Sequence, residues 1–184
     1  MLTLEDIKKN EEVNTLLRLA QKQLDVGAIG ISTATLHETE VLVNAGINSI
    51  LIANEITGES NLKLLIDLAA ETEIILAVDH EAIVNDIARL SAGKKNKLSL
   101  LADIDLGLKR CGIQPGNAAV GLAKKILEKQ LRFDGLMGYE GHLQRMFADN
   151  ESQLVRKEAM HQLLATKSML MRSGIDVNII STGG

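Results

Sequence analysis

Three chemically active side chains fall within one five-residue stretch of the sequence. Tyr139 supplies a phenol hydroxyl, Glu140 a carboxylate and His142 an imidazole, a group that exchanges protons near neutral pH. Gly138 and Gly141 allow the backbone to bend tightly around them. Isolated tyrosines and histidines in loops usually have structural roles, but the density of functional groups favours chemistry here. We therefore predict Tyr139 and His142 as catalytic residues.

A guanidinium is the second candidate group. Arg110 lies in the segment between Gly107 and Gly112, where the glycines permit a tight loop. Arginine stays charged and donates hydrogen bonds in a fixed plane, so Arg110 is suited to bind an anion or to face a ring nitrogen. Its neighbour Lys109 is predicted to face solvent, and Cys111 to be a small thiol that is buried or half-buried.

The last four residues form the third candidate, a phosphate-binding turn. Ser181 and Thr182 carry hydroxyls, and Gly183 and Gly184 follow them directly. A hydroxyl–glycine turn after a late strand of a barrel presents backbone N–H groups to an anion.

Acidic residues also follow two apolar runs, at Asp79 and at Asp103 and Asp105. A spacing of two along a strand puts two carboxylates on one face but supplies no third ligand. We therefore predict no metal in this chain, and regard His80, which follows Asp79, and the pair Asp103 and Asp105 as polar fillers or as neighbours of a cofactor.

Short β-branched runs alternate with longer amphipathic segments, a pattern typical of βα units and a parallel sheet. The first predicted element is a helix over residues 4–25, in which Leu16, Leu17, Leu19, Ala20 and Leu24 give an apolar face. Thr35 and Glu38 have the spacing of a capping box. The predicted strands cover residues 28–33, 49–54, 74–79, 98–105, 133–138 and 177–181.

All six predicted strands end in polar residues, among them Thr33, Asn54 and Asp79. Barrels gather functional groups at the carboxyl ends of many strands, whereas an open doubly wound sheet concentrates them at one switch point. The sequence therefore predicts an α/β fold, an incomplete TIM (β/α)₈ barrel of about six parallel strands with flanking helices.

The composition excludes several classes of protein. With 20 basic and 24 acidic side chains in 184 residues, the chain has no excess of positive charge with which to bind a polyanion, so nucleic acid is not expected as a partner. We find neither a long apolar run nor a secretion signal, and therefore expect no membrane association and a cytoplasmic location. The single cysteine excludes an internal disulfide and a zinc site built from cysteines.

Taken in order, these motifs resemble those of D-threonine aldolases and their D-serine dehydratase relatives. Such enzymes combine an alanine racemase-like barrel, which holds pyridoxal phosphate (PLP), with a β-rich carboxy-terminal domain. The resemblance implies that residues 1–184 are part of that barrel, equivalent to its strands 2–7, and that the β-rich domain is absent. The motifs that carry the resemblance are Gly27–Ile31, Ala34-Thr35 with Glu38 and Glu40, Ile50–Glu55, Ala77–Asp79, Asp105–Gly107, Arg110–Gly112 and Gly135–Gln144.

The resemblance also implies roles for individual residues. Arg110 would face the pyridine nitrogen of PLP, and Tyr139 and His142 would line the pocket. The phosphate would be held by the turn that Ser181, Thr182, Gly183 and Gly184 begin. The divalent metal of the family is bound by the β-rich domain, so it is not expected in this chain.

The anchoring lysine of the family is the main departure. It belongs to a Lys-x-His-Lys motif on the first barrel strand, but residues 11–15 at the corresponding spacing read Glu-Glu-Val-Asn-Thr. Lys8 and Lys9 lie in a polar helical start rather than at a strand end. Without this covalent anchor, efficient turnover is expected to fail. We therefore expect a truncated or split gene product that is inactive by itself or is completed by another polypeptide.

Three hypotheses about function follow. The first is a PLP-dependent lyase lineage that acts on D-3-hydroxyamino acids, by C–C cleavage or by elimination, with the activity of this chain itself left open. The second is a non-catalytic PLP-binding barrel or a decayed homologue. The third is an unrelated barrel that binds another phosphorylated metabolite. Expected partners are a D-amino acid substrate and, through open strand edges, a second copy or a completing polypeptide.

Overall fold

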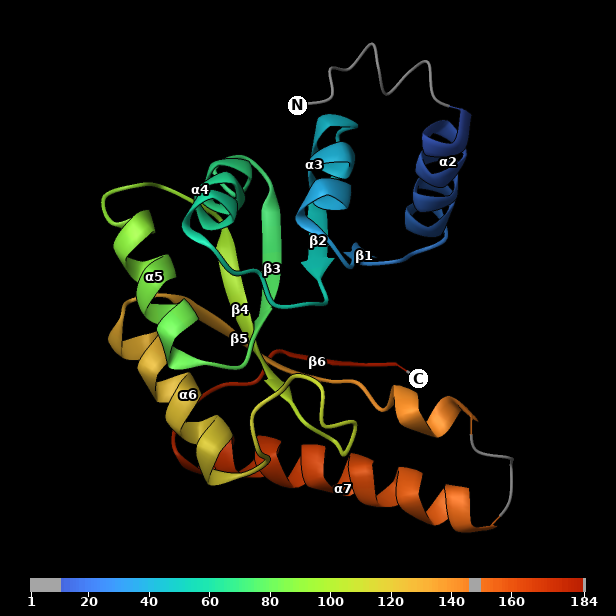
Figure 1. Ribbon diagram of the computed structural model, residues 1–184, viewed down its shortest axis with the longest axis vertical. Coiled ribbons are helices and arrows are strands. Elements are labelled where there is room, and N and C mark those ends of the chain that lie inside the picture. The colour runs from blue at the N-terminus through green and yellow to red at the C-terminus, as the bar shows by residue number, and fades with distance from the viewer. Residues whose placement is uncertain (1–10, 146–149, 184) are drawn as a thin grey trace. The chain divides into compact units, whose positions relative to one another are not determined.

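The computed structural model describes residues 11–145 and 150–183, and in it strands and helices alternate along the chain (Figure 1). The chain divides into two compact units. The amino-terminal unit comprises residues 1–76 and 90–98, and the carboxy-terminal unit comprises residues 77–89 and 99–184.

Six strands follow one another in the sheet in the order β1-β2-β3-β4-β5-β6. The pairs β1–β2, β2–β3, β4–β5 and β5–β6 are parallel, and a helix connects each strand to the next. This sequential connectivity is that of a (β/α)₈ barrel and confirms the predicted fold class, an incomplete barrel of six units. The strands are β1 Ile31–Thr33, β2 Ser49–Ile52, β3 Glu73–Val78, β4 Leu98–Ile104, β5 Arg132–Gly138 and β6 Ile179–Thr182.

The first helix ends at Asp25, as predicted. The capping box before α3 is present: the Glu38 backbone N–H donates to Thr35 Oγ1, and Glu38 Oε2 accepts from the Thr35 N–H. The helices are α2 Glu11–Asp25, α3 Leu36–Asn44, α4 Glu59–Leu68, α5 Glu81–Ser91, α6 Asn117–Glu128, the 3₁₀ turn η1 Gly141–Arg145 and α7 Asn150–Arg172. Residues 4–10 of the first predicted helix lie outside the described residues.

Helix α2 turns a narrower apolar face to its unit than the sequence predicts. Leu17 and Leu24 pack on a cluster that includes Ala20, whereas Leu16 is 63% exposed and Leu19 is 52% exposed. Leu17, Ala20 and Leu24 are spaced by three and four and share one helix face, whereas Leu16 lies at the border of that face and Leu19 lies outside it. The buried members of the cluster are Ala20, Leu42, Ile47 and Ile50.

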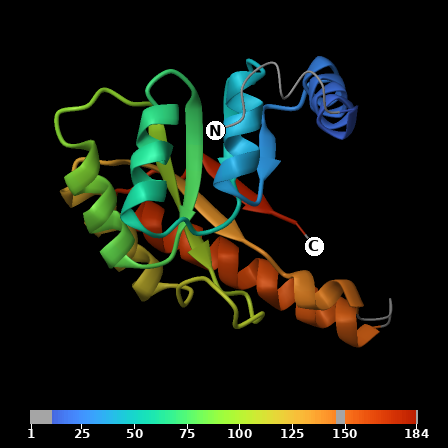
Figure 2. The same ribbon diagram turned by 45° about the horizontal axis from the view of Figure 1, so that its top comes forward.

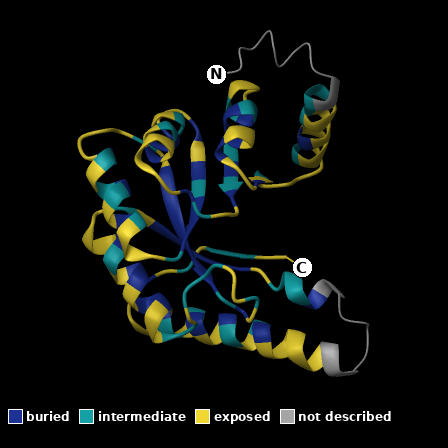
Figure 3. Cartoon of the chain, viewed as in Figure 1, coloured by how far each residue is buried: buried dark blue, intermediate teal, exposed yellow. Residues whose placement is uncertain are grey.

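The carboxy-terminal unit is built on two strands that are buried on both faces. All seven residues of β4 are buried, and only Arg132 of β5 is exposed (Figure 3). Strands covered on both faces are mostly apolar, and the polar exceptions that are buried here are Ser99, Asp103 and Asp134. Helix α7 packs against α6 and β5 (Figures 1 and 2). Its buried side chains recur at helical spacing and are Ala159, Leu163, Thr166 and Leu170.

A buried carboxylate lies near the amino-terminal ends of β4, β5 and β6. The Asp134 side chain is only 7% exposed and pairs with Arg132, whose Nη2 lies 2.8 Å from Asp134 Oδ2. Burial raises the pKa of Asp134. Hydrogen bonds from Arg132, Ser99 and Asn178, together with the charge of Arg132, lower this pKa by more than burial raises it. The net effect is a pKa below the usual 3.8. Because this group lies at the end of the strands opposite their carboxyl ends, we assign it to stability.

The pH dependence of unfolding tests this assignment. A carboxyl group whose pKa is lowered on folding stabilises the protein above its unfolded pKa, and the effect is lost as the pH falls through the folded value. Asp134→Asn is therefore expected to cost about 1–3 kcal/mol of unfolding free energy at pH 7, with the difference shrinking below pH 3.8. Urea titrations between pH 3 and pH 7 measure it, and a difference independent of pH would contradict the assignment.

Within the described residues, no helix combines the length and the apolar character needed to cross a membrane.

Candidate functional site

Three neighbouring strands of the carboxy-terminal unit end in one row. Ile104 of β4 pairs with Gly138 of β5, and Gly138 pairs with Thr182 of β6. The residues that follow these strands therefore start from the same edge of the sheet. This register brings three segments to a common edge: residues 105–113, called the Arg110 loop below, residues 139–141 around Tyr139, and the predicted phosphate turn.

The Arg110 loop leaves β4 and returns to its end. The backbone N–H of Ile113 donates to the Asp103 carbonyl at 2.8 Å, and the N–H of Asp105 donates to the Ile113 carbonyl at 3.0 Å. Inside the loop, Asp105 Oδ1 accepts from the backbone N–H groups of Gly107 and Lys109, at 2.9 and 3.0 Å. Asp105 thus fixes the first half of the loop with its own side chain.

The second half of the loop turns at Gly112. This residue has a φ of +100°, and a Cβ atom added to it would lie 2.5 Å from the Asp105 nitrogen. Only glycine fits such a position. The Gly112 N–H donates to Asp79 Oδ2 at 3.0 Å, which ties the loop to the residue that follows β3. The loop is therefore held at both halves, by Asp105 and by Asp79.

Arg110 and Tyr139 are brought together. The Arg110 Cζ atom lies 5.7 Å from the centre of the Tyr139 ring, within the range of a cation–π contact. Arg110 is exposed and Tyr139 is 38% exposed, so both remain accessible to a ligand. The notch between them is small, about 10 Å³. Its lining residues are Asp103, Ile104, Asp105, Leu108, Arg110, Cys111 and Tyr139.

The glycines around Tyr139 make room for side chains. A Cβ atom at Gly138 would lie 2.7 Å from Leu106 Cδ1, and one at Gly141 would collide with the Tyr139 ring. The Tyr139 ring therefore lies directly against Gly141. This packing gives a physical reason for the Gly-Tyr-Glu-Gly pattern that the sequence singled out.

His142 is not placed in the Arg110–Tyr139 notch. It lines a separate, mostly apolar groove of about 520 Å³ between the start of the Arg110 loop and the first half of α7, with Glu158 and Gln162 among the other lining residues. Within the described residues, its Nδ1 atom is buried without a hydrogen-bond partner. Its role as a catalytic residue remains a prediction, and the geometry favours Tyr139.

The predicted phosphate turn begins at the end of β6. Ser181 is half-buried, whereas Thr182 and Gly183 are exposed. Gly184 lies outside the described residues. The three described residues are thus at the expected edge of the sheet, and their binding of phosphate stays a prediction.

The lysines lie away from the expected anchor position. Residues 11–15 belong to α2 rather than to a strand, and Lys8 and Lys9 lie outside the described residues. Lys109 is the only lysine on the described loops that follow the carboxyl ends of strands. It is exposed, as the sequence predicts, and has a φ of +56°.

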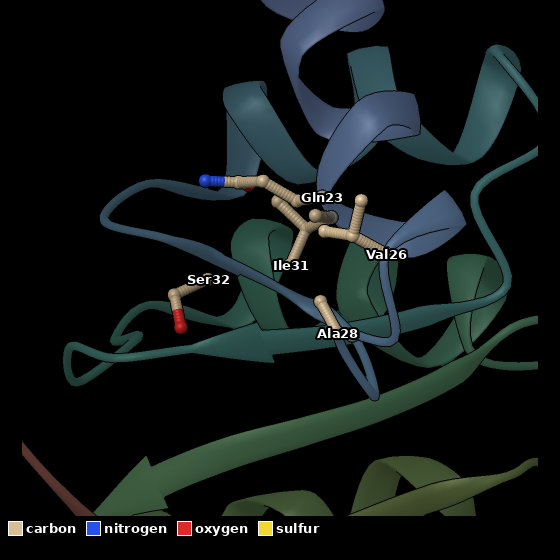
Figure 4. Close-up of a pocket in the computed structure, with 6 residues that line it drawn as sticks. Gln23, Val26, Ala28, Ile31 and Ser32 are labelled. Carbon is tan, nitrogen blue, oxygen red and sulfur yellow. The ribbon is translucent and has the colours of Figure 1, made fainter.

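The amino-terminal unit has a hollow of its own beside β1 (Figure 4). It measures about 460 Å³ and is open to solvent. Its lining residues are Gln23, Val26, Ala28, Gly30, Ile31 and Ser32, none of which is charged. Nor do residues 11–145 and 150–183 contain any group of three His, Cys, Asp or Glu side chains arranged to hold a metal ion. The candidate chemistry therefore gathers around Arg110 and Tyr139.

Sequence reasoning missed the residues that hold Arg110 in place. The sequence predicts Asp105 only as a polar filler or cofactor neighbour and assigns Asp79 no role, yet their carboxylates accept three backbone N–H groups of the Arg110 loop. The Asp105 turn has a local signal, an Asp two residues before a Gly. The Asp79 bond joins residues 33 apart in sequence and leaves no such signal.

Comparison with known proteins identifies relatives of this chain. The curated relatives include a D-threonine aldolase of Arthrobacter sp, 29% identical over 167 residues, covering 90% of this chain and 44% of the relative. A 3-hydroxy-D-aspartate aldolase of Paracoccus denitrificans (strain Pd 1222) is 26% identical over 162 residues, covering 86% of this chain and 41% of the relative. This chain thus spans less than half the length of these relatives.

Solved structures show the same fold. A D-threonine aldolase from Filomicrobium marinum superposes with a TM-score of 0.87 at 29% identity, covering 91% of this chain and 46% of the other. D-threo-3-hydroxyaspartate dehydratase from Delftia sp. HT23 has a TM-score of 0.79 at 22% identity, covering 91% of this chain and 45% of the other. The family model described as "Alanine racemase, N-terminal domain" matches residues 6–184. The chain therefore belongs to the alanine racemase N-terminal domain family.

Proposed function

We propose that this chain forms the cofactor-binding wall of a PLP-dependent lyase that acts on D-3-hydroxyamino acids in the cytoplasm. One observation carries the proposal: a tethered Arg110 stands against the Tyr139 ring at the edge where β4, β5 and β6 end together. The two aldolases among the relatives, whose names describe cleavage of D-threonine and of 3-hydroxy-D-aspartate, support the substrate class.

The chemistry of the donor set fits PLP. Arg110 is a permanent cation that only donates hydrogen bonds, so it suits an acceptor atom on the cofactor ring, and the ring nitrogen is the predicted one. The hydroxyls of Ser181 and Thr182 and the backbone of Gly183 suit the phosphate. Arg110 follows β4 and the hydroxyl residues lie on β6, and both strands pair with β5, which lies between them, in one register.

The residues have separable tasks in this proposal. When bound, PLP supplies an electron sink for bonds broken at the substrate's α-carbon. Arg110 orients the ring, and Asp105 and Asp79 hold Arg110. In the aldolase type of reaction a base takes the proton of the 3-hydroxyl as the C–C bond breaks, and in the dehydratase type an acid protonates the departing hydroxyl. The Tyr139 hydroxyl is the better placed of the two predicted proton carriers, because His142 lines another groove.

The proposal includes a completing polypeptide or a second copy. In the strand order β1 and β6 are the outermost strands, and an open strand edge pairs readily with another chain. The anchoring lysine is proposed to come from a completing polypeptide, because a second copy lacks the Lys-x-His-Lys motif as well. Light scattering on the purified chain checks this point: a mass above 19.9 kDa supports a second copy. A monomeric mass leaves the completing polypeptide as the only form of the proposal.

Fluorescence gives a direct test of PLP binding. Tyr139 is the only tyrosine and the chain has no tryptophan, so its ultraviolet emission reports on the proposed site alone. Titration with PLP is expected to quench this emission with saturation, whereas inorganic phosphate or an unphosphorylated pyridine at the same concentration quenches far less. Absence of saturable quenching up to millimolar PLP would contradict the proposal.

The same samples separate the alternatives. Borohydride reduction followed by peptide mapping shows whether a lysine becomes linked to PLP, with Lys109 the lysine at the described loop ends. Aldehyde release from D-threonine indicates the aldolase type, and ammonia release from D-3-hydroxyaspartate or D-serine the dehydratase type. Saturable binding without either product favours a non-catalytic PLP-binding barrel.

A further inference from the structure

We infer that Asp79 is a positioning residue for Arg110, acting through the backbone of Gly112. The inference rests on the proposed role of Arg110. Asp79 follows the last residue of β3, and its Oδ2 atom accepts the Gly112 N–H at 3.0 Å. Gly112 lies two residues after Arg110, at the point where the loop turns back to β4.

The Asp79 bond constrains a part of the loop that Asp105 does not reach. Asp105 Oδ1 accepts from Gly107 and Lys109, both on the approach to Arg110. Beyond Arg110, the chain must pass Gly112 before Ile113 rejoins the end of β4. Asp79 holds that turn from a different strand. The bond therefore fixes where Arg110 stands relative to the sheet, as well as the local shape of the loop.

Helix α5, which follows Asp79, does not use the Asp79 carboxylate as an N-terminal cap. Before α5, the Ala82 backbone N–H donates to His80 Nδ1 at 3.1 Å, so His80 satisfies that end of the helix. Asp79 is half-buried, and a hydrogen bond to an ionised acceptor is about twice as strong as one between neutral groups. Fixing the loop in advance lowers the entropy that a ligand of Arg110 must lose on binding.

Trypsin measures the tether without any cofactor. The enzyme cleaves after Lys109 and Arg110, both exposed, and cleavage requires the loop to open. Asp79→Ala is expected to raise the initial cleavage rate at these two bonds about tenfold, the effect of about 1.4 kcal/mol. Cleavage after Lys129, which lies just past α6, is the internal reference and should not change.

Two further variants make the test specific. Asp79→Asn keeps an oxygen that accepts the Gly112 N–H, so it should restore most of the protection. Asp86→Ala removes an exposed aspartate of α5 that pairs with Arg89 and should behave like the unmodified chain. In Tyr139 fluorescence titrations, Asp79→Ala should weaken PLP binding about tenfold, and Asp79→Asn should weaken it less.

Each outcome decides something. Unchanged cleavage in Asp79→Ala overturns the tether, and equal loss in Asp79→Ala and Asp79→Asn overturns its hydrogen-bonding basis. Faster cleavage with unchanged PLP affinity overturns the positioning of Arg110. If the unmodified chain fails to bind PLP, the proposed function fails, whereas the cleavage rates still decide whether Asp79 holds the loop. If Asp79→Ala does not fold, the test rests on Asp79→Asn. This variant must then show faster cleavage and weaker PLP binding than the unmodified chain, each by less than tenfold.

Discussion

Replacing Arg110 with alanine is expected to weaken PLP binding about 10- to 100-fold, the largest functional effect that a single substitution in this site should have. The reason is that Arg110 combines a permanent charge with a loop held at both halves, so its hydrogen bond to the cofactor costs little ordering. Loss of one hydrogen bond to a charged group corresponds to about 1.5–3 kcal/mol. The measurement is the midpoint of Tyr139 quenching by PLP.

Lys109→Ala is the matched control for this substitution. The substitution removes an adjacent positive charge from the same loop. Because the Lys109 side chain is predicted to face solvent, the affinity of the variant for PLP should change less than threefold. Arg110→Lys should fall between the two, because a lysine keeps the charge and loses the planar donor group. Equal weakening by Lys109→Ala and Arg110→Ala would show that only the net charge of the loop matters.

Gly135→Ala is expected to destabilise the protein more than any substitution in the site. Gly135 has a φ of +149°, and a Cβ atom added there would collide with the Ile179 carbonyl oxygen of β6. The neighbouring register shows an irregularity, since Leu100 pairs with Phe133 and Leu101 with Gly135. Backbone strain and a collision that forces β6 away should together cost at least about 3 kcal/mol.

Gly174→Ala separates the collision from the backbone conformation. Gly174 also has a positive φ, +74°, but a Cβ atom there would meet nothing within 4 Å, so the cost should be about 1 kcal/mol. Urea denaturation measures both variants. Because β6 carries Thr182 into register with Gly138, Gly135→Ala should also weaken PLP binding. Equal stability of the two variants would contradict the predicted collision.

Local patterns in the sequence predict most of the fold. The β-branched runs, the capping box of Thr35 and Glu38 and the apolar spacing of α6 depend on neighbours within a few residues, and such signals can be read without tertiary structure. Strand ends moved by one to three residues, most at β1, where Ala28, Ile29 and Gly30 precede the strand. Helix α2 buries fewer leucines than its composition suggests, because only one of its faces meets the unit.

Part of the candidate site can likewise be predicted from local sequence, and part of it cannot. Arg110 and Tyr139 can be selected from the sequence because their residue types and flanking glycines are unusual, and the parallel register brings them to one edge. The sequence by itself also determined the βα order and the family motifs. Only the tertiary structure separated His142 from Tyr139 and joined Asp79 to Gly112. The physical reason is that a side chain's direction and a hydrogen bond across 33 residues depend on how distant segments pack, which no local periodicity records.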